Sequence, residues 1–240
     1  MFNIIIHSLK PSNLIKLLSI SIKWLLVLTI LFMTIGLYYA LFNSPDDYQQ
    51  GSAVKIMYIH VPAAWLSMLV YTILTLASIL YLIYRNILYD LIAKSVVIIG
   101  TVFTFITLLT GALWGKPIWE TWWVWDARLT SVLILFFLYL SYIVLYYNFE
   151  IKENSAVPCA ILAIVGCINI PIIKFSVNFW HTLHQPATIF RVDNFHIHYS
   201  MLIPLILMFL GYLSFFLLVT SIRLKALLLS RKIIRLQKGY

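Results

Sequence analysis

The chain has 240 residues, of which 62% are hydrophobic and only 10% are charged. This composition indicates a polytopic membrane protein and excludes a separate soluble domain. The motif Cys-x-x-Cys-His is absent, so the chain is not itself a c-type cytochrome.

Six apolar runs follow one another along the chain, each close to the roughly 20 residues that a helix needs to cross a bilayer. We expect them at 24–42, 62–84, 95–113, 129–149, 157–173 and 200–222. The first run is too long for a signal peptide and no clear cleavage site follows it, so we expect it to be retained. Pro62 suits the first turn of the second helix. The sequence therefore predicts an all-α integral membrane protein, with residues 1–240 in one polytopic domain.

Six transmembrane helices would place both termini on one side of the membrane. Twelve of the 17 Lys and Arg residues lie on that side of the predicted topology, and five lie on the other. The positive-inside rule then puts both termini in the cytoplasm, or in the matrix of a mitochondrion. The functional loops would face outward, and residues 223–240 would form a basic interfacial helix. The net charge of +9 follows from this topology and gives no reason to expect nucleic acid as a partner.

The most informative stretch is the predicted outer loop 114–128. It holds five of the chain's eight tryptophans: Trp114, Trp119, Trp122, Trp123 and Trp125. Gly115 and Pro117 are expected to end the preceding helix. The spacing of the middle three tryptophans predicts a short helix that presents them as an aromatic plate.

Asp126 and Arg128 place opposite charges beside these tryptophans. The combination suits a flat, mostly apolar ligand with an anionic edge, such as a porphyrin. The alternative is an aromatic belt, because Trp and Tyr collect at membrane interfaces without a further role. Five tryptophans within residues 114–125 are denser than a belt requires.

Five of the six histidines are expected on the outer face: His60, His181, His184, His196 and His198. A lone interfacial histidine is usually only a hydrogen-bonding residue, but several beside a tryptophan cluster favour haem iron, for which imidazole is a common axial ligand. Zinc needs three or four compactly spaced donors, and the pair His181 and His184 offers two. Two histidines from separate loops therefore fit haem better.

Four segments, 46–51, 57–65, 114–131 and 170–186, closely resemble the cytochrome c maturation protein C family, also called haem exporter protein C. The string Trp-Trp-Val-Trp-Asp-Ala-Arg-Leu-Thr resembles the WWD motif of a wider haem-handling superfamily. Together with Thr-Leu-His-Gln and the six-span length, it points to this family. The resemblance extends over about residues 24–222.

The resemblance implies a protein that binds haem b at the outer face, with His60 and His184 as axial ligands. One face of the haem would lie on the aromatic loop, at Trp114, Trp119, Trp122, Trp123, Trp125 and Asp126. Such a protein delivers haem to a membrane-tethered haem chaperone for c-type cytochrome biogenesis and is not an enzyme. Further implied partners are a small single-span accessory protein and the ATPase and permease subunits of an ABC transporter, within the lipid bilayer.

The resemblance also implies a location in the bacterial inner membrane with the haem site facing the periplasm. The alternative is the mitochondrial inner membrane, facing the intermembrane space. Cations are scarce on the outer face, so Arg128 and Lys116 are the candidates for the haem propionates. The alternative for Arg128 is pairing with Asp126.

Two positions depart from the family's usual pattern. Glu120 stands where the family usually has Gly, which adds bulk and negative charge to the loop. His181 stands where the family usually has Asn, which makes it an alternative to His184 as the second ligand.

Two other functions stay open. A haem permease subunit of an ABC-type transporter is expected to carry ionisable residues or broken helices near the midplane, and the predicted spans are nearly free of charge. A membrane metalloenzyme with a metal-activated water would lose activity with chelators and would lack the Soret band of a haem protein.

Overall fold

The computed structural model describes residues 11–180, 182, 184 and 197–237. Six helical segments in it are long and apolar enough to cross a membrane, which confirms the prediction of an all-α protein with six transmembrane helices. Within the described ranges the only strand-like pairing is an isolated bridge between Asp47 and Gly51. The chain is a multi-pass membrane protein.

The first transmembrane segment is α2 (Pro11–Tyr38) with its π-helical extension η1 (Tyr39–Asn43). A 3₁₀ turn, η2 (Ser52–Ile56), leads into α3 (Met57–Tyr84), and α4 (Ile87–Trp119) and α5 (Ala127–Asn148) follow. The fifth segment comprises α6 (Ala156–Gly166) and α7 (Asn169–Phe179), preceded by the turn η3 (Lys152–Ser155). The last helix, α8 (Tyr199–Gln237), continues without a break through residues 223–237, so the described part of the basic tail extends the sixth transmembrane helix and does not form a separate one.

Two expectations about helix ends are wrong. Pro62 lies inside α3, because this helix begins at Met57. Helix α4 does not break at Gly115 or Pro117 but continues to Trp119. A proline so close to the end of a helix removes one backbone hydrogen bond and leaves the preceding turns intact. The loop between α4 and α5 is therefore 120–126, shorter than the predicted 114–128.

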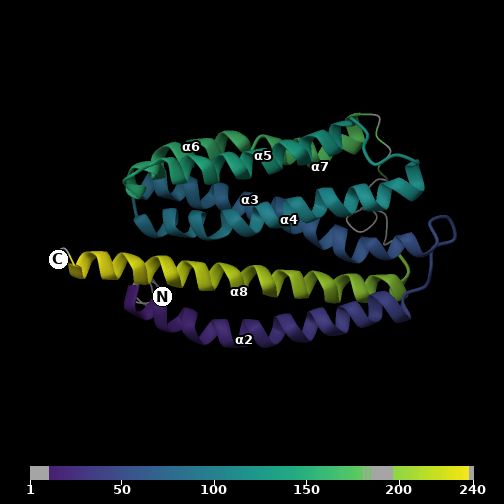
Figure 1. Cartoon of the computed structure of the whole chain (residues 1–240), viewed down its shortest axis with the longest axis horizontal. Helices are drawn as coiled ribbons and strands as arrows, with labels where there is room; N and C mark the ends of the chain where they lie inside the picture. Colours follow the sequence, from purple (N-terminus) through teal and green to yellow (C-terminus); the bar gives the residue numbers. More distant parts are fainter. Residues whose placement is uncertain (1–10, 181, 183, 185–196, 238–240) are drawn as a thin grey trace.

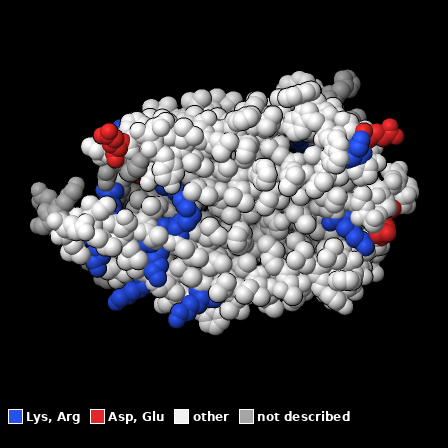
Figure 2. Space-filling model, in the orientation of Figure 1, with Lys and Arg blue, Asp and Glu red and all other residues white. Residues whose placement is uncertain are grey.

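The helices form three antiparallel pairs that lie side by side (Figure 1). Helices α3 and α4 form the central pair, with α2 and α8 on one side and α5 with α6 and α7 on the other. Both described ends of the chain lie at one end of the bundle, and Lys and Arg gather at that end (Figure 2). We call it the basic end, and the opposite end, where α4 meets α5, the loop end.

Small residues let the outer pair pack closely. A Cβ added to Gly36 of α2 would lie 3.0 Å from Met208 Sδ, and one added to Gly211 of α8 would lie 3.1 Å from Met33 Sδ. Each glycine therefore faces a methionine of the other helix. Close packing of this kind holds helices together in lipid, where the surrounding acyl chains are as apolar as the side chains.

Buried tyrosines join the central pair to α5. Tyr71 of α3 and Tyr139 of α5 are almost completely inaccessible to solvent, and their rings meet edge to face with centroids 5.0 Å apart. The Tyr139 hydroxyl donates to the backbone carbonyl of Ser67 at 2.8 Å. This packing fixes α5 against α3, and the start of α5 carries part of the candidate site.

Candidate ligand site at the loop end

Two of the predicted ligand residues pack against the last turns of α4. His60, in the first turn of α3, meets Trp114 edge to face with ring centroids 5.6 Å apart. His184, beyond the end of α7, meets Trp119 in the same way at 4.9 Å. Because Trp114 and Trp119 both belong to α4, this helix brings the two imidazoles to one end of the bundle.

The ring orientation of His60 is set by α4. Its Nδ1 lies 3.0 Å from the Thr110 hydroxyl oxygen. That hydroxyl donates its hydrogen to the Ile106 carbonyl at 2.6 Å, so it accepts from His60, and Nδ1 carries the proton. The lone pair of the neutral ring is then on Nε2. Gly111 leaves space for the ring, since a Cβ there would lie 3.0 Å from His60 Cε1.

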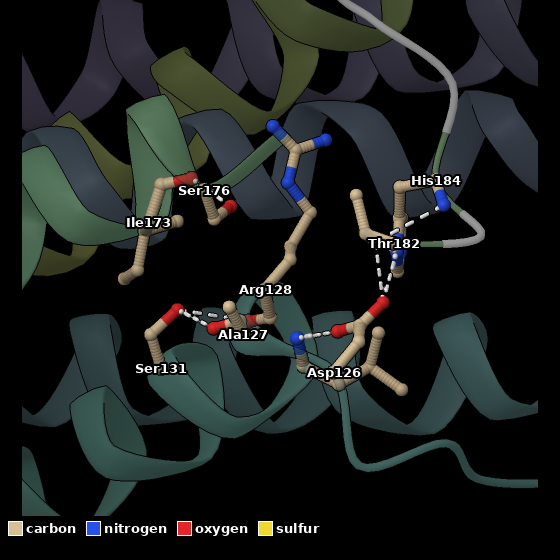
Figure 3. A network of polar contacts seen from close by, with 9 residues as sticks. Asp126, Ala127, Arg128, Ser131, Ile173, Ser176, Thr182 and His184 are labelled. Carbon is tan, nitrogen blue, oxygen red and sulfur yellow. Dashed lines mark hydrogen bonds and ion pairs between the residues drawn. The ribbon is translucent and has the colours of Figure 1, made fainter. Parts of the chain in front are cut away.

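His184 is oriented in the same sense by a different set of groups (Figure 3). Its Nδ1 lies 3.3 Å from Asp126 Oδ2 and 3.3 Å from the Thr182 hydroxyl oxygen. The Thr182 hydroxyl donates to Asp126 Oδ2, and a carboxylate only accepts, so the imidazole proton is again on Nδ1. A carboxylate behind an imidazole is the arrangement that orients metal-binding histidines.

Asp126 uses both carboxylate oxygens. Oδ1 accepts from the backbone N–H of Leu129 at 2.7 Å and caps the start of α5, while Oδ2 faces Thr182 and His184. Burial by itself raises the pKa of this carboxyl. The hydrogen bonds from Thr182 and Leu129, together with His184, outweigh burial and hold the Asp126 pKa below its ordinary value. The ionised Asp126 carboxylate therefore accepts the hydrogen bond that orients the His184 ring.

Burial lowers the pKa of His184 below its ordinary value. The Asp126 carboxylate opposes this shift, and the Arg128 cation adds to it. At neutral pH the pair is therefore a carboxylate and a neutral imidazole, which is the form of histidine that binds metals.

Arg128 lies in the first turn of α5, and its guanidinium extends away from Asp126 into the space between α7 and His184 (Figure 3). It is close enough to act electrostatically on both His60 and His184. Among the residues that the structure describes, no ion pair joins Arg128 to Asp126 or to another carboxylate. The guanidinium is thus not used by a carboxylate of the described residues.

Lys116, the other residue predicted to contact an anion, interacts with groups of its own loop. Its Nζ donates to the Glu120 carbonyl at 2.8 Å and lies 5.9 Å from the centroid of the Trp122 ring. Glu120 ends α4 in the left-handed conformation with φ +59°. Glycine adopts this conformation without strain, which is a physical reason for the glycine that the resemblance led us to expect at this position. The loop keeps its turn although a glutamate occupies the position.

The predicted aromatic plate of Trp119, Trp122 and Trp123 is not formed, because the left-handed residue at 120 ends the helix between the first and second of them. Trp119 packs against His184, whereas Trp122 is 56% exposed. Trp123 meets Trp125 edge to face at 5.5 Å, and Trp125 is 76% exposed. The buried Nε1 of Trp123 has no acceptor within the described part of the chain.

Sequence reasoning missed the groups that hold the rings in place. Thr110 carries no signal except its helical spacing from Trp114. Gln50, whose side-chain oxygen accepts from Trp114 Nε1 at 3.0 Å, and Thr182 stand in the segments that carried the family resemblance. The alternative ligand His181 lies outside the described residues, so its position stays a prediction.

The chain is similar to known proteins over most of its length. The family model described as "Heme exporter protein C" matches residues 4–238. A heme exporter protein C of Bradyrhizobium diazoefficiens is 45% identical over 95% of this chain and 86% of its own length. A putative cytochrome c biosynthesis ccmC-like mitochondrial protein of Marchantia polymorpha is 49% identical over 74% of this chain and 75% of its own. The heme exporter protein C of Escherichia coli K12 is 42% identical over 74% and 73%.

Replacing Asp126 by Asn tests how the His184 ring is held. In the wild type at pH 7.5 we expect nitrogen-15 NMR of histidine-labelled protein to show neutral His184 with its proton on Nδ1. Its pKa lies below the ordinary value of about 6.5, so protonation is expected only at lower pH. Asp126→Asn presents an amide N–H to Nδ1 and should move the proton to Nε2. Asp46→Asn, at an exposed ion pair with Lys55, is the control. An unchanged tautomer in Asp126→Asn would contradict the assignment.

Proposed function

The chain belongs to the heme exporter protein C family, and from that membership we propose that it binds haem b at its loop end and delivers it for c-type cytochrome biogenesis. The observation that carries this proposal is the matched pair His60 and His184. Each has its Nδ1 hydrogen-bonded and its Nε2 lone pair available. Haem iron accepts one or two axial nitrogens of this kind.

The surrounding residues suit the rest of the haem molecule. Arg128 is the cation best placed for a propionate, since its guanidinium lies near both imidazoles and forms no ion pair among the described residues. Trp114 and Trp119 flank the two histidines with apolar surface. The Nε1 of Trp123 has no hydrogen-bond acceptor among the described residues, so it is a further donor for the anionic edge of the haem. Haem would supply the iron to which the two imidazoles bind, and it would be the cargo of the protein.

Exposed aromatics support a role in delivery. Trp122 and Trp125, in the loop between α4 and α5, are exposed, and among the described residues neither ring packs against a histidine. A carrier has to hold its cargo without enclosing it, so an exposed aromatic rim beside the ligands suits transfer to a membrane-tethered haem chaperone. We propose that transfer is non-enzymatic, with a small single-span protein and ABC transporter subunits as further partners.

The charge distribution supports the orientation of the site. Lys and Arg gather at the basic end, which the positive-inside rule places in the cytoplasm or matrix (Figure 2). The two histidines lie at the opposite end of the bundle. We therefore propose a bacterial inner-membrane protein with its haem site facing the periplasm. The similarity to a ccmC-like mitochondrial protein keeps the mitochondrial inner membrane as the alternative.

A permease is the second candidate, because the fifth transmembrane segment is broken between α6 and α7. Backbone groups at this break are hydrogen-bonded. The N–H groups of Cys167 and Ile170 donate to the carbonyls of Ile164 and Cys167, and the Ala163 carbonyl accepts from the Thr75 hydroxyl at 3.2 Å. The Asn169 side chain also ties the start of α7 to α5, since its Nδ2 donates to the Ser131 carbonyl at 2.8 Å. A break whose polar groups are satisfied by neighbouring helices needs no transported ligand to explain it. Haem accumulation in sealed vesicles that contain only this chain would favour the permease.

The first prediction concerns the axial ligands. Changing His60 or His184 to Ala should lower the haem content of the purified protein or alter its spectrum, and the double change should abolish the Soret band, because both iron–nitrogen bonds are lost. His198→Ala is the control, since His198 is exposed at the start of α8 and bonds to Ser200. Wild-type haem content in the double variant would rule the pairing out. Loss in His181→Ala but not in His184→Ala would move the second ligand to His181.

The second prediction concerns the propionates. The wild type should bind haem at least about tenfold more tightly than haem dimethyl ester, which is the effect of one charge-assisted hydrogen bond. Arg128→Gln should remove this preference, and Lys116→Gln should keep it, because Lys116 is bonded to Glu120. Titrations followed by the Soret band measure both affinities. An undiminished preference for the free acid in Arg128→Gln would contradict the role of Arg128.

The third prediction concerns delivery. Trp122→Ala and Trp125→Ala should lower covalent haem on the co-expressed chaperone while the Soret band of the purified protein persists, because neither ring packs against a histidine. Trp119→Ala should affect both measurements, since Trp119 contacts His184. The control is Trp24→Ala, which removes an exposed tryptophan from α2. Normal chaperone loading in both loop variants would show that these rings only anchor the loop.

A further inference from the structure

The basic end of the bundle holds a small cavity between α4, α5 and α8. Its volume is about 50 Å³, several times the roughly 15 Å³ that one water molecule needs. The cavity is lined by Lys94, Val97, Ile98, Ile143, Tyr146, Tyr147, Arg223 and Leu227. This cavity is far from the histidines, and no feature of haem binding accounts for it.

The lining on α4 and α5 changes along the bundle axis. On α4, Lys94 lies one turn nearer the basic end than Val97 and Ile98. On α5, Tyr146 and Tyr147 lie in the last turn, beyond Ile143. On these two helices the charged and phenolic groups therefore lie nearer the basic end than the aliphatic groups, which is the polarity order of a lipid headgroup and its acyl chains. On α8 the order is reversed, because Leu227 lies one turn nearer the basic end than Arg223.

One cation in the cavity lacks a matched anion. Lys94 is paired with Asp90 at 2.7 Å, and both side chains are buried. Within the described part of the chain, the hydrogen bond of Arg223 is a long one, from its Nη2 to the Lys94 backbone carbonyl at 3.4 Å. Its Nε is buried and finds no acceptor in the described ranges of the chain. A buried guanidinium donor without an acceptor is unfavourable, so a bound anion would stabilise this end of α8.

We propose that this cavity binds the phosphate of an anionic phospholipid from the leaflet at the basic end, with Arg223 as its main contact. Helices α5 and α8 each pack on α4 and pack little on each other, so the cavity lies where they separate and a lipid could enter from the side. Basic pockets between transmembrane helices on the cytoplasmic or matrix side are sites of this type. The acyl chains would lie along Val97, Ile98 and Ile143. The proposal is independent of the haem site.

Native mass spectrometry of the full-length, delipidated protein tests the proposal with phosphatidylglycerol and phosphatidylcholine as probes. The wild type should retain phosphatidylglycerol in preference to phosphatidylcholine, and Arg223→Gln should weaken that retention about tenfold. The matched control is Lys225→Gln, which removes an equal charge two residues further along α8 but outside the cavity. Lys225→Gln should retain phosphatidylglycerol as the wild type does. Both variants remove one positive charge, so both lower the general attraction of the basic end for anionic lipid by the same amount.

Two results would overturn the proposal. One is equal retention of phosphatidylglycerol by Arg223→Gln and Lys225→Gln. The other is full displacement of the lipid by inorganic phosphate at equal concentration, which would identify a site for free phosphate instead. Circular dichroism confirms that each variant is folded. If Arg223→Gln does not fold, Arg223→Lys keeps the charge and removes the Nε donor, and it should still lose most of the preference for phosphatidylglycerol.

Discussion

The carboxylate of Asp126 is the group on which the candidate haem site depends. One of its oxygens caps α5, and the other accepts from Thr182 and orients His184. The start of a transmembrane helix and the orientation of a ligand are thus coupled through one side chain. Arg128 follows in the first turn of the same helix, so the N-terminus of α5 also determines where the nearby cation lies.

The two histidines have the same tautomer, with the proton on Nδ1, but different groups determine it. His60 belongs to a helix and is oriented by a threonine that already donates to its own helix, whereas His184 lies outside the helices and is oriented by a carboxylate. Both arrangements protonate Nδ1 and leave Nε2 available. A carboxylate makes its histidine a stronger donor to a metal than a hydroxyl does. The two histidines would therefore bind the iron of the proposed haem with different strength, which suits the delivery that we propose.

The two ends of the molecule have separate chemistry. Among the described residues, the loop end presents imidazoles, tryptophans and Arg128, and the basic end presents most of the Lys and Arg side chains and the cavity at Arg223. Between them lie the tyrosine-rich centre and the close α2–α8 pair. Because buried hydrogen bonds and close packing connect α3, α4 and α5, the loop end is supported by a rigid bundle rather than by the loops alone.

The sequence by itself determined the all-α class, the six transmembrane segments and the family, because runs of apolar residues and the Trp-Trp-Val-Trp-Asp string are local patterns. The tertiary structure decided where α4 ends. Pro117 signals a break, but the helix continues past it, and Glu120 ends it in a conformation more typical of glycine. For that reason the predicted tryptophan plate does not form. Asp126 was expected in the site, but the sequence did not show that it and Thr110 are the hydrogen-bond partners of the two histidines. The bond between His60 and Thr110 joins different helices, and the one between His184 and Asp126 joins residues 58 positions apart. Such contacts arise only when the chain packs.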